Sequence, residues 1–412
     1  MSRDEASPNV KRKPLAGIRV ADFTWVWAGP FCSLQLAHLG AEVIRVETAS
    51  RTCVTRLLPP WPDAQPGVNR SGYFNQYNQG KRSLSLNLKD ERAMEIARDL
   101  IRASDVVVEN FAAGVFARMG LGYETCRALK PDVVMISLSG YGASGPESEY
   151  VSYGPAQVPL SGFSSVTGYR GWRPMHIGVS YGDPTAGLQG ATAVLAALIH
   201  RRRTGQGQFI DLSQWESTMA LLPEAILAQT MSGHAPERDG NRDPSWAPHA
   251  IYRCAGDDRW VSIAVADNAE WRALANVIEP ALAADTRFAS AAARKQNEDA
   301  LDAAIGAWCA TRTREEVRDT LQAARVAAFP VMTAKDLHDD PHLGSRDYFV
   351  ELPHPEVGIR RHMGIPYRLH GTPIAVWRAA PCLGEDTDYV LRDVLGYRED
   401  RIEALRNASV LS

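Results

Sequence analysis

The stretch Ile18–Val46 reads IRVADFTWVWAGPFCSLQLAHLGAEVIRV and contains a complete strand, helix and strand pattern. Ile18–Ala21 is a short apolar run that predicts a strand, and Glu42–Val46 predicts the next one. Between them, Phe31–Leu39 has the apolar spacing of a helix, and Gly40 follows where helices commonly end. Two strands joined by a helix form a βαβ unit, so this stretch predicts two parallel strands of one sheet.

The same alternation continues along the first half of the chain. Further strands are predicted at Ser83–Leu88, Asp105–Val108 and Asp132–Leu138, and further helices at Lys89–Ala103 and Tyr123–Leu129. The predicted fold class is therefore α/β, with a parallel, doubly wound sheet. Ligands bind at the carboxyl ends of the strands of such sheets, which here lead into Trp25–Pro30, Glu47–Arg51, Glu109–Gly114 and Ser139–Pro146. None of these loops is Gly-x-Gly-x-x-Gly, which disfavours an NAD-dependent dehydrogenase.

The second half of the chain has a different pattern. A helix is predicted at Trp215–Ser232, followed by a connector rich in Gly, Pro, Asn and Asp. A hairpin (Ile251–Cys254 and Trp260–Ala266) and three helices (Glu270–Ile278, Asp299–Ala310 and Arg314–Ala324) come next, then extended segments at Tyr348–Pro355 and Gly364–Leu369 and a helix near Tyr389–Leu395. We predict a large domain over residues 1–215, a linker over 216–246, a small α+β domain over 247–332, and a segment over 333–412 that returns to the large domain.

Composition excludes several classes of function. The 412 residues include 45 basic and 48 acidic side chains, a net charge of -3, which gives no sign of nucleic-acid binding or of a surface for anionic lipid. The six cysteines are scattered without metal-ligand spacing, which favours reduced thiols, a cytoplasmic protein and no metal site. Met1–Pro14 lacks the apolar core of a signal peptide or anchor, and the longest apolar run, Ala191–Ile199, is too short to span a membrane.

One carboxylate stands out in the stretch Gly178–Gly190, GVSYGDPTAGLQG. Asp183 lies between Gly182 and Pro184, ahead of the apolar run that predicts a helix. Since a residue before proline avoids the α region, Asp183 is expected at the corner where the chain enters this helix. Its side chain would then either cap the helix or, because glycines leave both flanks open to a ligand, act as a nucleophile.

Several motifs resemble those of the class III CoA-transferases, the CaiB/BaiF family, which includes formyl-CoA transferase, carnitine CoA-transferase and the α-methylacyl-CoA racemases. The resemblance covers nearly the whole chain. The matching stretches are Leu15–Val20, Asp22–Phe23, Ala28–Pro30, Leu39–Ile44, Asn78–Ser83, Val108–Phe111, Arg118–Gly120, Ser139–Gly142, Gly145–Pro146, Gly182–Asp183, Asp340–Leu343 and His354–Pro355.

This resemblance implies a Rossmann-like large domain, a smaller α+β domain and an interlocked homodimer. It also implies that Asp183 is the catalytic nucleophile and that coenzyme A or acyl-CoA and a free carboxylic acid are the substrates, with no metal. The family's CoA contacts fall on Trp27, Ala28, Leu86, Lys89, Asn110, Phe111, Ala112 and Arg118. For three of these positions a second interpretation is open: Lys89 and Arg118 as solvated cations, and Phe111 as a core residue.

The resemblance leaves three functions open. The first is transfer of CoA from an acyl-CoA donor to a free acid, through an aspartyl anhydride and an aspartyl-CoA thioester. The second is an acyl-CoA racemase or isomerase, disfavoured because Tyr153–Ala156 lacks the His-Asp step of racemases, whose reaction needs two acid/base groups. The third is a CoA-binding subunit of a hetero-oligomeric transferase, which the presence of Asp183 disfavours.

Substrate choice is less defined by the sequence. Trp27 stands where formyl-CoA transferase has a glutamine, which makes oxalate and formate doubtful substrates. An aromatic wall near the acyl end is predicted from Trp25, Trp27, Tyr141 and Tyr181. A second carboxylate of a dicarboxylic acid would be recognised by a cation, for which the candidates are His38, Arg51, Arg56 and Arg173, all equally ordinary as surface charges.

Overall fold

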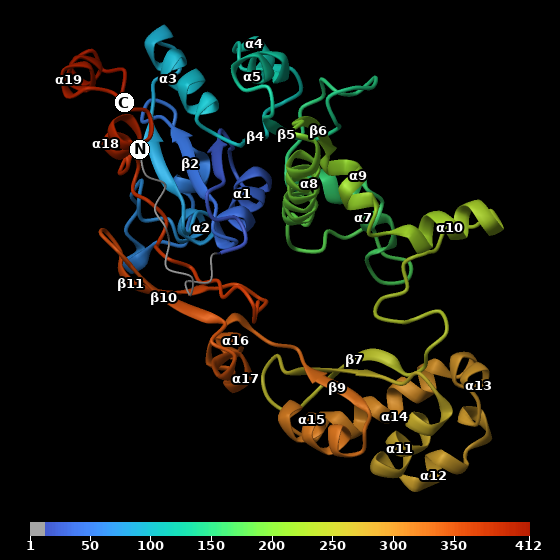
Figure 1. Ribbon diagram of the computed structural model, residues 1–412. Coiled ribbons are helices and arrows are strands. Elements are labelled where there is room, and N and C mark those ends of the chain that lie inside the picture. Colours follow the sequence, from blue (N-terminus) through green and yellow to red (C-terminus); the bar gives the residue numbers. More distant parts are fainter. Residues whose placement is uncertain (1–12) are drawn as a thin grey trace. The chain divides into compact units, whose positions relative to one another are not determined.

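The structure is a computed structural model, and it describes residues 13–412 (Figure 1). Most of the segment Met1–Pro14, and with it the prediction of no signal peptide, lies outside the described residues. Contacts group the chain into two compact units. One unit contains the chain up to Phe163, His176–Ser232 and Leu343–Ser412, and the other contains Ser164–Met175 and Gly233–His342. The domain boundaries drawn from the sequence stay a prediction.

A six-stranded sheet forms the centre of the first unit, in the order β3-β2-β1-β4-β5-β6. Every neighbouring pair is parallel, which confirms the predicted α/β class with a doubly wound sheet. The strands are β1 (Arg19–Asp22), β2 (Glu42–Glu47), β3 (Arg82–Ser85), β4 (Val106–Glu109), β5 (Val134–Ser139) and β6 (Gln208–Ser213). The chain order reverses at β1, and in open α/β sheets such a reversal places ligands beyond the carboxyl ends of the strands.

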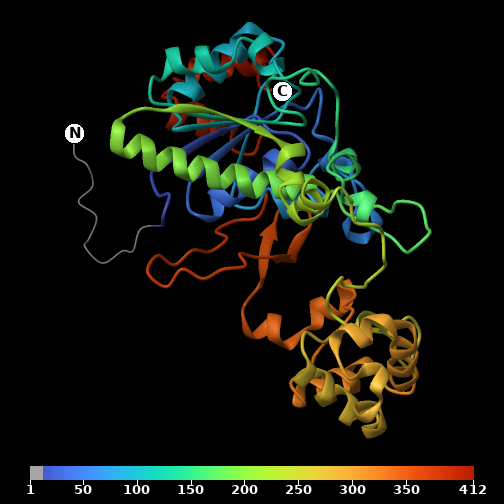
Figure 2. The same ribbon diagram turned by 90° about the vertical axis from the view of Figure 1, so that its right-hand side faces the viewer.

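Helices cover both faces of this sheet because its strands alternate two sets of apolar side chains. Val106 and Val108 face α1 (Ala28–His38) and α8 (Gly182–Thr204), whereas Val107 faces α3 (Glu91–Arg102) and α5 (Tyr123–Leu129). Figure 2 shows the long helix α8 along one face of the sheet, and the blue-green helices α3 and α5 lie on the opposite face. The same unit contains η1 (Val54–Leu57), η2 (Pro62–Ala64), α2 (Gly72–Tyr77), α4 (Val115–Arg118), α6 (Gly154–Leu160), α9 (Gln214–Met219) and α10 (Pro223–Ser232).

The C-terminal segment packs on this unit and covers the β3 edge. Its elements are β10 (Phe349–His354), β11 (Gly358–Met363), α18 (Thr387–Tyr389), η4 (Val390–Val394) and α19 (Glu399–Asn407). Asp386 accepts the Ser83 N–H at 3.0 Å through its carboxylate and donates its own N–H to the Ser83 carbonyl at 3.0 Å. The edge strand therefore has partners for backbone groups that would otherwise be open to pairing with another chain.

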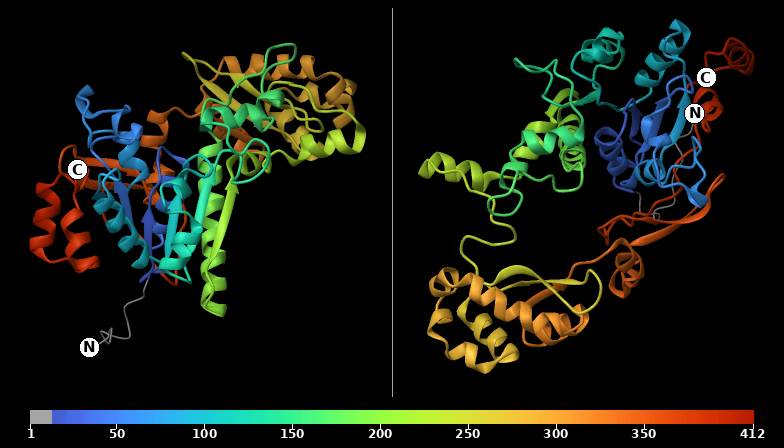
Figure 3. Two further views of the ribbon diagram at one scale, coloured as in Figure 1. Left: turned by 90° about the horizontal axis from the view of Figure 1, so that it is seen from above. Right: turned by 180° about the vertical axis from the view of Figure 1, so that it is seen from behind.

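One predicted element of this unit was wrong. The helix predicted over Trp215–Ser232 is broken into α9 and α10, because Pro223 has no N–H to continue a helix and instead begins α10. The predicted extended segment Gly364–Leu369 follows β11, the second strand of the hairpin, and forms neither helix nor strand. Strand β6, at the other edge of the sheet beside α8 (Figure 3, left), was not predicted, since it is mostly exposed and lacks a continuous apolar run.

The second unit is built on a three-stranded antiparallel sheet, β7 (His249–Arg253), β8 (Trp260–Ala264) and β9 (Ala327–Pro330). This confirms the predicted hairpin, because β7 and β8 pair antiparallel. Three helices agree with prediction to within two residues: α11 (Asn268–Ile278), α14 (Glu298–Ala310) and α15 (Arg314–Ala323). The unit also contains α12 (Pro280–Ala284), η3 (Thr286–Phe288), α13 (Ala291–Gln296) and α16 (Ala334–Asp339), while α7 (Phe163–Val166) and α17 (Pro341–Ser345) lie where the chain passes between units.

Candidate active site

Helix α8 begins one residue before Asp183. Gly182, Asp183 and Pro184 form its first residues, so Asp183 is already helical rather than at a corner ahead of the helix as predicted. Pro184 is tolerated because N–H groups of a first turn have no partner inside the helix. No side chain caps this helix at Tyr181, the residue before it. Among the described residues, the one hydrogen bond to the Asp183 carboxylate comes from Ala28, outside this helix, so capping of its own helix does not account for the acid.

The carboxylate of Asp183 accepts a hydrogen bond from the backbone N–H of Ala28, the first residue of α1. Helices α1 and α8 come close enough for this because Gly187 has no side chain: a Cβ there would lie 2.8 Å from the Ala28 carbonyl oxygen and 3.0 Å from the Phe31 Cβ. Gly154 in α6 lies on another side of the carboxylate, where a Cβ would be 1.5 Å from Oδ2 of Asp183. Glycines thus make room for the acid at the start of a neighbouring helix.

Burial determines the protonation of Asp183. The residue is 6% exposed, and within residues 13–412 it forms no ion pair. Burial raises the pKa of its carboxyl to about 7, while the hydrogen bond from Ala28 acts in the opposite direction. An acid with its pKa near neutrality and no charged partner is a candidate for a functional group.

Four aromatic side chains from α2 and the start of α1 form an aromatic cluster: Trp27, Phe31, Tyr73 and Tyr77. The ring centroids of Trp27 and Tyr77 are 5.1 Å apart, those of Trp27 and Tyr73 5.8 Å, and those of Phe31 and Tyr77 5.7 Å. Burial, mainly, and the charges of Tyr77 and Asp183 raise the pKa of Tyr73; burial, followed by the charge of Asp183, raises the pKa of Tyr77. The charge of Asp183 therefore acts on both tyrosines of the cluster.

Trp27 has a polar atom without a partner. The residue is 9% exposed, and its indole N–H has no hydrogen-bond acceptor among residues 13–412. The backbone around it is held at an unusual conformation, since Val26 has a φ of 61°, a region that β-branched residues rarely enter. The backbone N–H of Val26 donates to the sulfur of Cys53 at 3.3 Å. Strained backbone of this kind occurs at functional sites because the surroundings must enforce it.

Asn110, at the end of β4, fixes the same loop. Its side-chain oxygen accepts the Trp25 N–H at 2.7 Å and its side-chain nitrogen donates to the Trp25 carbonyl at 2.8 Å. Both polar ends of the Asn110 amide are therefore engaged by protein. The asparagine holds the loop that leads to Trp27.

A buried ion pair fastens the start of α1. Lys81 and Asp22 are fully buried, and the Lys81 ammonium lies 3.3 Å from the Asp22 carboxylate. Lys81 also donates to the Pro30 carbonyl and to the Asn78 side chain, each at 2.9 Å. Pro30 belongs to α1 and Asn78 follows α2, so this lysine ties together the two helices that supply the aromatic cluster.

Comparison with known proteins identifies the family. Residues 15–387 match the family described as CoA-transferase family III. The chain belongs to this family.

Individual members of CoA-transferase family III resemble the chain over nearly its full length. The succinyl-CoA–D-citramalate CoA-transferase of Chloroflexus aurantiacus is 32% identical over 97% of this chain and 98% of its own. The succinate–glutarate CoA-transferase of Agrobacterium fabrum is 32% identical over 94% of this chain and 97% of its own. A crystal structure of a CaiB/BaiF family protein from Brucella suis superposes with a TM-score of 0.84, at 29% identity, over 93% of this chain and 100% of that chain.

The other predicted CoA contacts of this family member lie after the carboxyl ends of β3 and β4. The Leu86 side chain is fully buried in the core, and the partly buried Phe111 packs against the same core with its ring 6.1 Å from that of Phe116. Lys89 is exposed and forms no ion pair with any described residue. Ala112 and Arg118 are exposed as well.

The cations proposed for a second carboxylate are not gathered at Asp183. Arg56 is fully buried and pairs with Glu47 at 2.7 Å, and burial lowers the pKa of His38 to about 4. Arg51 lies over the Trp25 ring, 5.2 Å from its centroid. Arg173 is exposed and belongs to the other unit. Of the predicted aromatic wall, Trp27 belongs to the aromatic cluster, whereas Tyr141 contacts Tyr150 and Trp215, and Tyr181 contacts Phe163.

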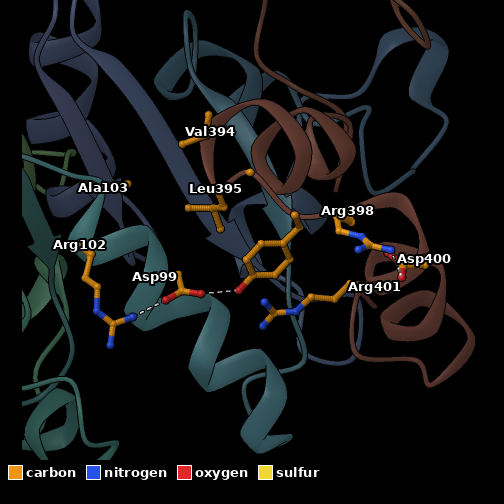
Figure 4. Close-up of a pocket in the computed structure, with 10 residues that line it drawn as sticks. Asp99, Arg102, Ala103, Val394, Leu395, Arg398, Asp400 and Arg401 are labelled. Carbon is orange, nitrogen blue, oxygen red and sulfur yellow. Dashed lines mark hydrogen bonds and ion pairs between the residues drawn. The ribbon is translucent and has the colours of Figure 1, made fainter. Parts of the chain in front are cut away.

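An open hollow of about 760 Å³ lies away from this acid, between α3 and the C-terminal segment (Figure 4). Tyr397 donates to Asp99 there at 2.5 Å, and Arg102 also pairs with Asp99. Asp183 and the aromatic cluster do not line the hollow, so it is not the candidate site. Among residues 13–412, no helix is both long and apolar enough for a membrane crossing, and no group of three or more His, Cys, Asp or Glu side chains is placed to hold a metal ion.

Proposed function

We propose that this protein transfers CoA from an acyl-CoA donor to a free carboxylic acid, with Asp183 as the nucleophile. The observation that carries the proposal is the direction of the Asp183 carboxylate, which leaves its own helix uncapped and meets the N-terminus of α1 instead. The acid is buried, free of ion pairs among the described residues and flanked by Gly154. Membership of CoA-transferase family III supports the reaction class.

The proposed reaction conserves the energy of the thioester. An Asp183 oxygen attacks the donor's thioester carbonyl, the carbon–sulfur bond breaks, and an aspartyl-acyl anhydride and CoA thiolate result. The thiolate then attacks the Asp183 carbonyl, which releases the first acid and leaves an aspartyl-CoA thioester. The acceptor's carboxylate attacks this thioester to form a second anhydride, and the thiolate, attacking the new acyl carbonyl, regenerates Asp183.

The start of α1 serves this chemistry. Helix N-termini favour negative charge, so the Ala28 N–H stabilises the ionised form of a buried acid that would otherwise be protonated. With a pKa of about 7, roughly half of the carboxyls are ionised at neutral pH, and the Asp183 carboxylate departs in the last step, when the thiolate attacks the acyl carbonyl of the second anhydride. Burial limits the access of water that would hydrolyse the anhydride.

The CoA contacts and the assembly are further parts of the proposal. Trp27 and Ala28 lie beside Asp183, and Leu86, Lys89, Asn110, Phe111, Ala112 and Arg118 follow the carboxyl ends of neighbouring strands, where a parallel sheet binds its ligand. Exposed Lys89 and Arg118 would meet phosphates, while Asn110 would contribute by positioning Trp25. We further propose an interlocked homodimer, because α10 buries none of its residues within this chain.

The decisive experiment looks for CoA bound to Asp183. Protein is incubated with a panel of acyl-CoA donors without acceptor, digested and analysed by mass spectrometry. CoA is expected on the peptide that contains Asp183, and the Asp183→Ala protein should neither carry it nor transfer CoA. Glu109→Gln is the matched control, because Glu109 is another buried acid whose pKa burial raises to about 7.

Each alternative gives a different result in that experiment. A racemase would leave the peptide unmodified and would exchange the α-proton of an acyl-CoA with deuterated solvent, without any free acid. A CoA-binding subunit of a hetero-oligomer would be inactive alone and active with its partner chain. An unmodified Asp183 peptide with every donor contradicts the proposed mechanism.

A further inference from the structure

The proposed function leaves the acid unidentified, and the surroundings of Asp183 bear on it. The Asp183 carboxylate meets the Ala28 N–H and Gly154, and its charge acts on Tyr73 and Tyr77 of the aromatic cluster (Trp27, Phe31, Tyr73 and Tyr77), in which Trp27 directly precedes Ala28. Three of the rings, Phe31, Tyr73 and Tyr77, are only partly buried, so a substrate can still reach them. Both acids must enter these surroundings, since the donor's acyl group and then the acceptor's carboxylate each form an anhydride with Asp183.

We propose that this site takes a monocarboxylic acid with an uncharged, apolar or aromatic chain, which packs against the aromatic cluster and whose carboxyl oxygen accepts the Trp27 indole N–H. The inference rests on the proposed function and adds the substrate class. A dicarboxylate such as succinate or glutarate would need a cation for its second charge.

Three candidate cations in this unit were named from the sequence, Arg56, His38 and Arg51, and none of them is available. The Arg56 guanidinium is enclosed, with donors engaged by the Glu47 carboxylate, Asn69 and the Pro381 carbonyl at 2.7–3.1 Å. His38 is buried and, with its pKa lowered to about 4, neutral at pH 7. The third, Arg51, is held over the Trp25 ring. A second carboxylate beside the cluster would therefore lose its water without gaining an ion pair from any of these three side chains, which is costly.

The unpaired indole N–H explains where the carboxyl end would bind. A buried donor without an acceptor is unfavourable in the free protein, and a ligand oxygen would satisfy it. Trp27 directly precedes Ala28, whose N–H reaches the Asp183 carboxylate, so the two donors flank the reacting groups from the same helix start. The strained Val26 backbone is part of what places this indole.

The test compares acids that differ in one property. Butyrate and succinate have the same number of carbons, and only succinate carries a second charge; cinnamate adds a ring. With a common donor, kcat/KM is expected to be at least about tenfold higher for cinnamate than for succinate, and higher for butyrate than for succinate, since a tenfold ratio needs only a modest difference in binding. Succinate or glutarate used as well as or better than cinnamate would overturn the inference and leave the CoA-transferase proposal intact.

Two variants assign the preference to the aromatic cluster. Tyr77→Ala should lower kcat/KM for cinnamate by roughly tenfold and change succinate little, because ring–ring contact is lost. Trp27→Phe keeps a ring but removes the N–H, and should lower kcat/KM for every acid by a similar factor of about ten, with the cinnamate-to-succinate ratio kept. Equal losses for all acids in Tyr77→Ala would show a structural effect and contradict the assignment.

A binding measurement keeps this test separate from that of the function. Saturation-transfer NMR with wild-type protein and CoA should show the cinnamate ring protons in contact with protein and no comparable signal from succinate. The cinnamate signal should be lost in Tyr77→Ala. If the protein transfers CoA to no acid, the proposed function fails, and this measurement still decides the inference: absent cinnamate binding, or equal succinate binding, overturns it.

Discussion

At the scale of single residues, Asp183 experiences two opposing effects. Burial disfavours its ionised form, whereas the N–H at the start of α1 favours that form. Burial dominates, since the pKa rises to about 7. At neutral pH the Asp183 carboxyl of the folded protein is therefore partly protonated, whereas in the unfolded chain it is ionised. This difference lowers the free energy of unfolding at neutral pH.

That cost predicts how an Asp183→Asn substitution changes stability with pH. Below the ordinary pKa of 3.8 both states are protonated and Asp183 costs nothing; as pH rises toward 7 only the unfolded chain ionises, so wild-type stability falls. Above pH 7 the loss is constant, and a shift of about three units corresponds to on the order of 4 kcal/mol. The asparagine variant does not titrate there, so its stability advantage over wild type should grow by roughly 3 kcal/mol between pH 5 and pH 8.

Denaturant unfolding of both proteins at the two pH values measures this difference. Asp257→Asn, at an exposed turn of the second unit, is the control and should behave as wild type at each pH. An advantage of Asp183→Asn that is the same at pH 5 and pH 8 would mean that the acid is not desolvated.

The sequence singled out the acid but not its surroundings. Asp183 could be recognised because glycines flank it and Pro184 marks a helix start, and these are local features. Its hydrogen-bond donor Ala28 and its neighbours Tyr73 and Tyr77 lie more than a hundred positions earlier in the chain, and only tertiary packing brings them together. The two tyrosines are four residues apart and so lie on one face of α2, a helix that was not predicted from the sequence. Nothing local connected that face to the acid.

At the scale of elements, the close approach of α6, α8 and α1 depends on residues without side chains. Gly154→Ala would put a methyl group 1.5 Å from Oδ2 of Asp183, so the carboxylate must move from the Ala28 N–H. Displacement of a nucleophile by about 1 Å costs on the order of a hundredfold in rate, so activity should fall by at least this factor. The loss is measured as the ratio of kcat for wild type and Gly154→Ala in steady-state kinetics with any acyl-CoA that the wild type accepts.

Gly344→Ala is the matched control for this substitution. A Cβ at Gly344 meets nothing within 4 Å, and the residue lies in the helix α17, where alanine is favoured over glycine by up to about 1 kcal/mol. Its activity should equal that of wild type. Full activity in Gly154→Ala would show that the carboxylate does not need its position at the start of α1.

The elements that the sequence predicted well are those with a strong local pattern. The buried strand β5 has six buried residues in succession, and α3 repeats its apolar residues with a helical period, so each was recognisable from a short window. Strand β6 is exposed over most of its length and owes its conformation to pairing with β5. The break between α9 and α10 was signalled by Pro223, but the apolar run on either side of it suggested one continuous helix.

At the scale of the whole molecule, α10 is the element that this chain alone does not explain. None of its ten residues is buried, and Ile226, Leu227 and Met231 are 41%, 53% and 84% exposed. A helix of this length is marginal in water unless an apolar face is covered. Since Leu227 and Met231 are four residues apart, they lie on one side, which is the face that the proposed second copy would cover.

The proposed interlocked homodimer therefore makes a prediction at α10. Light scattering after size-exclusion chromatography should give wild-type protein twice the mass of one chain, and dilution should not dissociate it, because interlocked subunits separate only by unfolding. Leu227→Glu with Met231→Glu places two charges in a face that each copy must bury, and loss of even one such apolar contact is worth about 1.5–3 kcal/mol. The double variant should be recovered as a monomer, whereas Gln229→Glu, on the other side of α10, should remain dimeric. A monomeric wild-type protein, or equal dissociation of both variants, would contradict the homodimer proposed at α10. The exposed face of α10 would then be covered by something other than a second copy of this chain.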